Sequence, residues 1–362
     1  MNMESLAREV EAFLESSSSA TAFEDLALRI FAFQYEANRP YRRFCERRGI
    51  RPKTVATWDD IPAVPSTAFR EVSMISFPKE EIVRTMTSSG TSKGKPSLIH
   101  FNEIGLRFWH LGPQAASRRF LFPDGVRHRS LFLIPSETTA PTLAIASGMP
   151  NLVKNHSLGE PEYFIDAGGL RLEALVTRLR ELEGSGEPVA LVGATFGFVH
   201  FFDYCLKQHL RFELGNGRLC DGGGFKGRSR EMKKDEFYAQ AREILGIPTD
   251  RMVNALGLCE VSNVYFDNVL VDRDNAAIRA RLKKVPPWCR VVIVDPETLR
   301  PVPRGQTGLI RHYSLTNLST VIAVQTDDLG VEVGDGFEIL GRAQGAEAKG
   351  CSISVDELLS KA

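Results

Sequence analysis

Apolar residues recur at helical spacing near the start of the chain. Leu6 and Val10 fall on one face of a helix over residues 3–15, and the same spacing continues over residues 20–36. A proline-punctuated connector, TWDDIPAVPSTAFRE, follows. We therefore predict a helical N-terminal region and connector over residues 1–75.

The middle of the chain alternates between short β-like runs and amphipathic stretches. The runs include residues 130–134, 189–192 and 252–255, and the amphipathic stretches include residues 169–183 and 228–244. Such an alternation is typical of an α/β fold.

Beyond residue 286 the apolar runs follow one another through short loops. They are residues 289–294, 307–311, 319–324 and 336–340. This pattern predicts an antiparallel or barrel-like lobe. We assign the α/β core together with this lobe to residues 76–340, and a short C-terminal arm to residues 341–362.

The composition narrows the classes of function. Of the 362 residues, 43% are hydrophobic and 25% are charged, as in ordinary globular proteins. Lys plus Arg equal Asp plus Glu at 45 each, so the charge balance does not favour a nucleic acid or an anionic membrane as a partner. The chain starts with an acidic, polar segment and has no run of about 18 apolar residues. We expect a cytoplasmic protein without a signal peptide or membrane span.

The six cysteines are scattered without a CxxC pair or a Cys/His cluster. This argues against a structural zinc site and a disulfide framework, and it favours reduced thiols. Cys351 stands out because it lies in Lys349-Gly350-Cys351-Ser352, close to the C-terminus, where chain segments tend to be mobile. A thiolate is the attacking form of cysteine, and Lys349 or Arg342 would lower the pKa of this thiol if the fold brings them close.

The most informative stretch is a run of hydroxyls, glycines and lysines. It comprises Ser88, Ser89, Gly90, Thr91, Ser92, Lys93, Gly94 and Lys95. Glycines let the backbone curl around an anion, so that N–H, hydroxyl and ammonium groups can face phosphate oxygens. The run is not a Walker A loop, because three residues separate its glycines instead of four and Pro96 follows the second lysine. From the residues alone, it is either a phosphate cradle or a solvated turn.

This loop resembles the phosphate-binding signature of the acyl-adenylate-forming enzymes. Within that superfamily the chain is most similar to the acyl-protein synthetase (LuxE) family, whose "IP.lP...F" connector is matched by Ile61-Pro62, Val64-Pro65 and Phe69. The resemblance implies the large N-terminal lobe of such an enzyme, with α/β sub-lobes, a small β-barrel-like lobe and a truncated C-terminal domain. It also implies ATP and Mg²⁺ as cofactors.

Two further glycine-containing stretches match elements of the superfamily. Gly222, Gly223 and Gly224 follow a β-like run and, by resemblance, border the adenine. Gly257 belongs to the stretch Leu256-Gly257-Leu258-Cys259-Glu260, which is similar to the "YGxTE" element. A glycine cluster after a strand permits close approach of a flat ligand.

The carboxylate of the "YGxTE" element helps to hold Mg²⁺ near the phosphates, and the resemblance gives this role to Glu260. The chain departs from the element at two positions. Leu256 replaces an aromatic residue that would stack on adenine, and Cys259 replaces a threonine. We therefore expect nucleotide contacts that are weaker or differently made.

The segment Thr326-Asp327-Asp328-Leu329-Gly330 resembles the "TGDLG" element, whose Asp binds the ribose hydroxyls. Asp328 aligns with that Asp, and a carboxylate can accept two such hydrogen bonds. Asp327 stands where glycine is expected. Arg342 aligns with the "GR" that ends the large lobe, and it is a suitable partner for ribose or phosphate oxygens.

The resemblance implies ATP-dependent activation of a fatty or aryl carboxylic acid as acyl-AMP, followed by transfer to a thiol. In this family a cysteine near the C-terminus accepts the acyl group before it passes to a partner, which points to Cys351. Full-length acyl-CoA synthetases have a C-terminal lobe with a catalytic lysine. Here either Lys349 or a loop lysine takes that role, or adenylation relies on the large lobe alone.

Three alternatives stay open at this point. The chain could be an acyl-CoA or acyl-carrier-protein ligase that uses an external thiol. It could be a non-catalytic relative that binds a nucleotide or a partner. A third reading is a hydrolase or acyltransferase that works without ATP.

Overall fold

The computed structural model describes residues 2–16, 19–87, 96–224, 229–272 and 281–343. The chain divides into two compact units. The first consists of residues 1–115, 258–263 and 282–362, and the second of residues 116–257 and 264–281.

Three helices open the first unit. They are α1 (Met3–Glu15), α2 (Ala20–Ala37) and α3 (Arg39–Arg47). Their starts are capped by side-chain oxygens of Asn2, Ser19 and Asn38, which accept hydrogen bonds from backbone N–H groups in the first turn. The helical spacing of the sequence is thus confirmed, and the apolar faces of α1 and α2 are buried.

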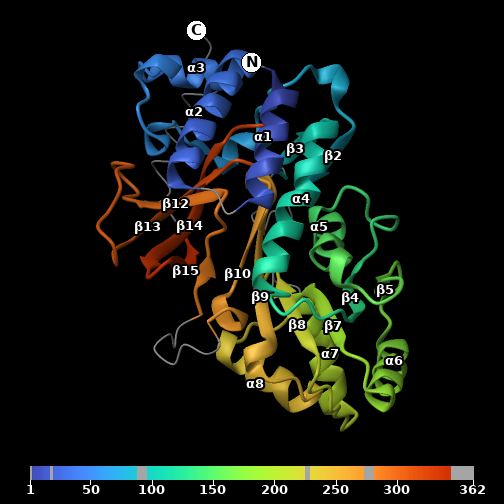
Figure 1. The fold of residues 1–362 in the computed structure, drawn as a ribbon. Helices are drawn as coiled ribbons and strands as arrows, with labels where there is room; N and C mark the ends of the chain where they lie inside the picture. Colours follow the sequence, from blue (N-terminus) through green and yellow to red (C-terminus); the bar gives the residue numbers. More distant parts are fainter. Residues whose placement is uncertain (1, 17–18, 88–95, 225–228, 273–280, 344–362) are drawn as a thin grey trace. The chain divides into compact units, whose positions relative to one another are not determined.

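The first unit also contains a six-stranded sheet in the order β11-β15-β14-β13-β12, with β1 paired to β14. The strands are β1 (Val64–Pro65), β11 (Lys283–Lys284), β12 (Cys289–Val294), β13 (Thr307–Ser314), β14 (Ala323–Val333) and β15 (Gly336–Arg342). All pairs are antiparallel except β1 with β14. Figure 1 shows the N-terminal helices, in blue, beside the orange and red strands of this sheet. The predicted antiparallel lobe is confirmed.

One predicted strand begins later than the sequence indicated. The apolar run 319–324 predicted a strand from Ser319, whereas β14 begins at Ala323. The residues before it form a buried loop, in which the backbone oxygen of Leu318 and the backbone N–H of Ile322 bond the side chain of Gln34. The backbone oxygen of Ile322 accepts from the N–H of Ser314 on β13. Burial of a loop requires such partners for its backbone, and hydrophobicity alone could not reveal them.

A short hairpin, β2 (Arg84–Thr87) with β3 (Leu98–Phe101), flanks the glycine- and lysine-rich stretch of the first unit. The helix α4 (Glu103–Phe120) follows it. Residues 88–95 between the two strands are outside the described part of the chain.

The second unit is built on a seven-stranded sheet in the order β10-β9-β8-β7-β4-β5-β6. Its strands are β4 (Arg129–Pro135), β5 (Glu162–Asp166), β6 (Gly169–Leu170), β7 (Val189–Ala194), β8 (Arg218–Gly222), β9 (Met252–Leu258) and β10 (Asn263–Phe266). Strands β5, β4, β7, β8 and β9 run parallel to one another, and β6 pairs antiparallel with β5. The predicted α/β alternation is confirmed.

The helices of the second unit are α5 (Ala144–Val153), α6 (Leu172–Ser185), α7 (Thr195–Lys207) and α8 (Lys234–Leu245). Apolar side chains of α6, α7 and α8 share one buried cluster with those of the sheet, and these helices are visible beside the sheet in Figure 1. Helix α6 starts after the predicted residue 169 because Gly169 and Leu170 pair with β5 as a strand. Helix α8 starts at Lys234 instead of residue 228.

Among the described helices, none combines the length and the apolar character required to cross a membrane.

Candidate functional site

The glycine cluster of the second unit follows the carboxyl end of β8. Ligands of open α/β sheets bind at the carboxyl ends of the strands. A Cβ added to Gly222 would lie 2.7 Å from the backbone oxygen of Ala255, so this position accepts only glycine without a shift of β9. Gly223 and Gly224 have φ of 73° and 64°, a region that favours glycine. The close approach of β9 and the positive φ angles therefore favour glycine at these three positions, which the sequence alone did not reveal.

Gly257 lies near the end of β9, next to β8 in the same sheet. It is exposed, and a Cβ added there would meet no atom within 4 Å. Packing among the described residues therefore does not require glycine at this position, and the assignment of Gly257 to a nucleotide site stays a prediction.

A buried carboxylate beneath the glycine cluster was missed by the sequence reasoning. Asp221 is only 3% exposed, and its carboxylate accepts hydrogen bonds from Thr195 Oγ1 at 2.8 Å, Asn254 Nδ2 at 3.0 Å and Tyr238 OH at 3.1 Å. These donors come from α7, β9 and α8, so one side chain ties three elements to the end of β8. Its position directly before the glycines is the feature of the sequence that could have identified Asp221.

In the first unit, Asp328 and Arg342 are register partners on β14 and β15. The Nε of Arg342 donates to Oδ1 of Asp328 at 3.2 Å, and the Asp328 side chain is 14% exposed. Burial raises the pKa of Asp328 above its usual range, and the guanidinium of Arg342 opposes that rise. The two residues that resemblance assigned to the ribose are thus neighbours in space.

Glu260 lies on a short 3-10 turn of the first unit, η7 (Cys259–Val261), directly after β9. Its side chain is half-buried, and its backbone oxygen accepts a hydrogen bond from Asn317 Nδ2 at 2.8 Å. Ser262, which ends the turn, has φ 51° and ψ 41°, a left-handed conformation uncommon for a residue with a side chain. Burial raises the pKa of the neighbouring Cys259 thiol well above its usual value.

Several predicted site residues lie outside the described residues. They are Ser88, Ser89, Gly90, Thr91, Ser92, Lys93, Gly94, Lys95, Lys349 and Cys351. Their assignments stay predictions, as do the domain boundaries expected at residues 75 and 340.

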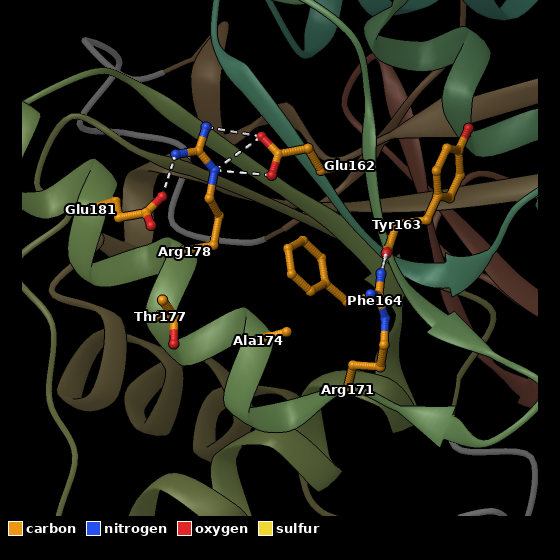
Figure 2. Close-up of a pocket in the computed structure, with 8 residues that line it drawn as sticks. All are labelled: Glu162, Tyr163, Phe164, Arg171, Ala174, Thr177, Arg178 and Glu181. Carbon is orange, nitrogen blue, oxygen red and sulfur yellow. Dashed lines mark hydrogen bonds and ion pairs between the residues drawn. The ribbon is translucent and has the colours of Figure 1, made fainter.

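A pocket of about 500 Å³ in the second unit contains none of the predicted site residues. Figure 2 shows it between β5 and α6, where Arg178 bonds Glu162 at 2.9 Å and Glu181 at 2.8 Å. The charges of these three side chains pair with one another.

Comparison with known proteins is consistent across family, relatives and fold. The family model of the acyl-protein synthetase LuxE matches residues 10–360. A long-chain-fatty-acid–luciferin-component ligase of Vibrio harveyi is 25% identical over 341 residues, which cover 90% of this chain and 85% of the relative. A phenylacetate-coenzyme A ligase of Thermus thermophilus is 23% identical over 318 residues, covering 81% of this chain and 61% of that relative.

Among solved structures, an open conformation of 2-hydroxyisobutyryl-CoA ligase in complex with 2-HIB-AMP and CoA has a TM-score of 0.64. It is 16% identical in sequence, and the match covers 89% of this chain and 75% of that structure. At this identity the likeness establishes the fold, which is that of the large lobe of these ligases.

Proposed function

Because the chain belongs to the LuxE family of acyl-protein synthetases and is therefore a ligase that activates an acyl group with ATP, we propose that it converts a fatty or aryl acid to acyl-AMP and transfers the acyl group to Cys351. From this thioester the acyl group passes to a partner protein, carrier or reductase. We place this activity in the cytoplasm.

The burial of the other described thiols supports the assignment of Cys351 as the acyl acceptor. The five described cysteines are all buried. Burial raises the pKa of Cys45 and of Cys205 to about 12 and raises that of Cys259 as well. Thiolate is the nucleophilic form, so these groups are poor acyl acceptors. Cys351, beside Lys349 in the sequence, is the remaining candidate.

The first step joins two anions, so the site must offset their repulsion. A carboxylate oxygen of the acid attacks the α-phosphorus of ATP, and the bond to pyrophosphate breaks. Asp328 accepts hydrogen bonds from the ribose hydroxyls, and Arg342 balances its charge. Lys93 and Lys95 offset the negative charge that develops on the phosphates.

The carboxylates of this chain fit a magnesium ion that is bound by the protein and by the phosphates of the nucleotide together. Over the described ranges, no three His, Cys, Asp or Glu side chains form a group that could hold a metal ion. Mg²⁺ is usually held by one or two carboxylates together with substrate phosphates. A single half-buried carboxylate such as Glu260 meets this pattern. The ion would neutralise phosphate charge in the transition state.

In the second step the Cys351 thiolate attacks the carbonyl carbon of acyl-AMP. A thioester forms, and AMP leaves with the electrons of the carbon–oxygen bond. The cationic side chain of Lys349 favours the thiolate form.

Use of an external thiol is the second candidate, because the chain is also similar to a relative named phenylacetate-coenzyme A ligase. In that case acyl-AMP forms in the same way, but coenzyme A or a carrier-protein thiol takes the place of Cys351.

The mass of the intact protein after incubation with ATP, Mg²⁺ and a panel of carboxylic acids separates these outcomes. We expect an acyl-sized increase in wild type and in the matched control Cys205→Ala, and no increase in Cys351→Ser, with pyrophosphate released by all three. An acylated Cys351→Ser protein would refute the assignment. Pyrophosphate release without any acylated protein would favour the external thiol.

A further inference from the structure

The turn that carries Glu260 is held by a side chain that neither the family elements nor the sequence spacing identified. Asn317 lies in the loop before β14, is 1% exposed and belongs to the same unit as Glu260. Its Nδ2 donates to the backbone oxygen of Glu260 at 2.8 Å and to that of Val321 at 2.7 Å. Its Oδ1 accepts from Ser262 Oγ at 3.2 Å and Thr320 Oγ1 at 2.6 Å.

These four hydrogen bonds use the full capacity of the amide. A primary amide has two N–H donors and one oxygen with two lone pairs. Aspartate has nearly the same shape but no donor, so at position 317 it would turn a carboxylate oxygen towards two backbone oxygens. Glutamine has the same amide, but its side chain is one methylene longer and would place that amide at a different point.

The backbone conformation held by this amide is strained. Ser262 ends the turn with φ 51°, and it is 1% exposed. Its hydroxyl bonds Asn317, and its carbonyl oxygen accepts from Thr316 Oγ1 at 3.0 Å. A residue with a side chain keeps a left-handed conformation only when its surroundings hold it there, and such positions concentrate at functional sites.

A side chain of helix α2 also bonds the loop that contains Asn317. Gln34 of α2 has no exposed surface, and its Nε2 donates to the backbone oxygen of Asn317 at 2.8 Å. Its Oε1 accepts from the backbone N–H of Ile322 at 2.7 Å. The N-terminal helical region thereby supports the loop that supports Glu260.

We propose that Asn317 is a positioning residue, which fixes the strained turn at Ser262 and so holds the Glu260 carboxylate in place for the magnesium ion of the nucleotide. The inference rests on the proposed role of Glu260. Partners that orient a metal ligand typically change metal affinity by about 10- to 100-fold when they are removed. A general loss of stability would instead lower the active fraction and leave the metal requirement unchanged.

The test compares Asn317→Asp with Tyr41→Phe. Tyr41 is a matched control because its buried hydroxyl donates to the backbone oxygen of Pro62 at 2.7 Å in the same unit, away from the turn. Two readouts are taken: Mg²⁺-dependent binding of a non-hydrolysable ATP analogue by calorimetry, and hydrogen exchange of the backbone amides over residues 259–263. Neither depends on turnover.

We expect Asn317→Asp to need roughly tenfold more Mg²⁺ for half-maximal binding and to exchange the turn amides faster, with both quantities unchanged in Tyr41→Phe. Adding Ser262→Gly should recover part of the Mg²⁺ shift, because glycine adopts φ above zero without support. If Asn317→Asp does not fold, Thr316→Val removes one bond to the Ser262 backbone and should shift the Mg²⁺ requirement in the same direction by less.

Glu260→Gln separates failure of the inference from failure of the proposed function. If Glu260→Gln raises the Mg²⁺ requirement while Asn317→Asp and Thr316→Val leave it at the wild-type value, Asn317 does not position the carboxylate and the inference is overturned. If Glu260→Gln itself leaves the requirement unchanged, the proposed metal role of Glu260 is wrong.

Discussion

Protonation of His312 should destabilise the first unit as the pH falls. His312 lies on β13 with no exposed surface, and its ring is 6.2 Å from that of Phe337 in a T-shaped arrangement. Burial lowers the pKa of His312 from 6.5 to about 3. The unfolded chain therefore takes up a proton at a pH where the folded protein does not. The contribution of His312 to stability is complete above about pH 6.5 and is lost as the pH falls towards 3.

The size of this effect follows from the shift in pKa. Each pKa unit corresponds to about 1.4 kcal/mol. At about pH 5, roughly one and a half units below the ordinary histidine pKa, the expected loss is about 2 kcal/mol. That is a substantial part of the roughly 5–15 kcal/mol by which proteins are stable, so it is measurable.

Urea denaturation at about pH 7.5 and about pH 5 measures the loss directly. Carboxylates and other histidines contribute equally in wild type and in His312→Gln, which cannot take up a proton, so the difference between the two proteins isolates His312. We expect the fall in unfolding free energy to be about 2 kcal/mol smaller in His312→Gln. Parallel pH dependences of wild type and His312→Gln would refute the reasoning.

Three further predictions address the candidate site and the thiols. Asp328→Asn should raise the KM for ATP roughly ten- to hundredfold by loss of charge-assisted hydrogen bonds. An unchanged KM would contradict the ribose assignment. The same variant should raise the Tm at neutral pH but not below about pH 3.8, because burial raises the pKa of Asp328 and its charged form disfavours folding. Gly222→Ala should displace β9, since its Cβ would lie 2.7 Å from the Ala255 oxygen, and we expect a loss of about 1–3 kcal/mol by denaturation together with weaker nucleotide binding. Iodoacetamide should leave five thiols of the native protein unmodified, and peptide mapping that finds rapid labelling beyond Cys351 would argue against the thiol assignment.

The order and type of many elements could be predicted from local pattern. The helical spacing of residues 3–15 and 20–36 became α1 and α2, and the β-like run at 189–192 became part of β7. These segments obey their pattern because one face or the whole strand is buried, and burial selects apolar residues at the period of the element. The start of β14 departed from its pattern because Gln34, nearly three hundred positions away, bonds the loop before it.

The sequence by itself predicted the family, which the comparisons confirm, and it proposed residues for the chemistry: a glycine-, hydroxyl- and lysine-rich loop, the Asp328 and Arg342 positions and a cysteine near the C-terminus. Such signals are local, because a motif is a short run of residues. The tertiary structure alone decided that Asp328 and Arg342 face each other across two strands, that Asp221 joins three elements and that Asn317 holds the turn of Glu260. Hydrogen bonds between residues far apart in sequence depend on how the strands and loops come together, and no spacing along the chain encodes them.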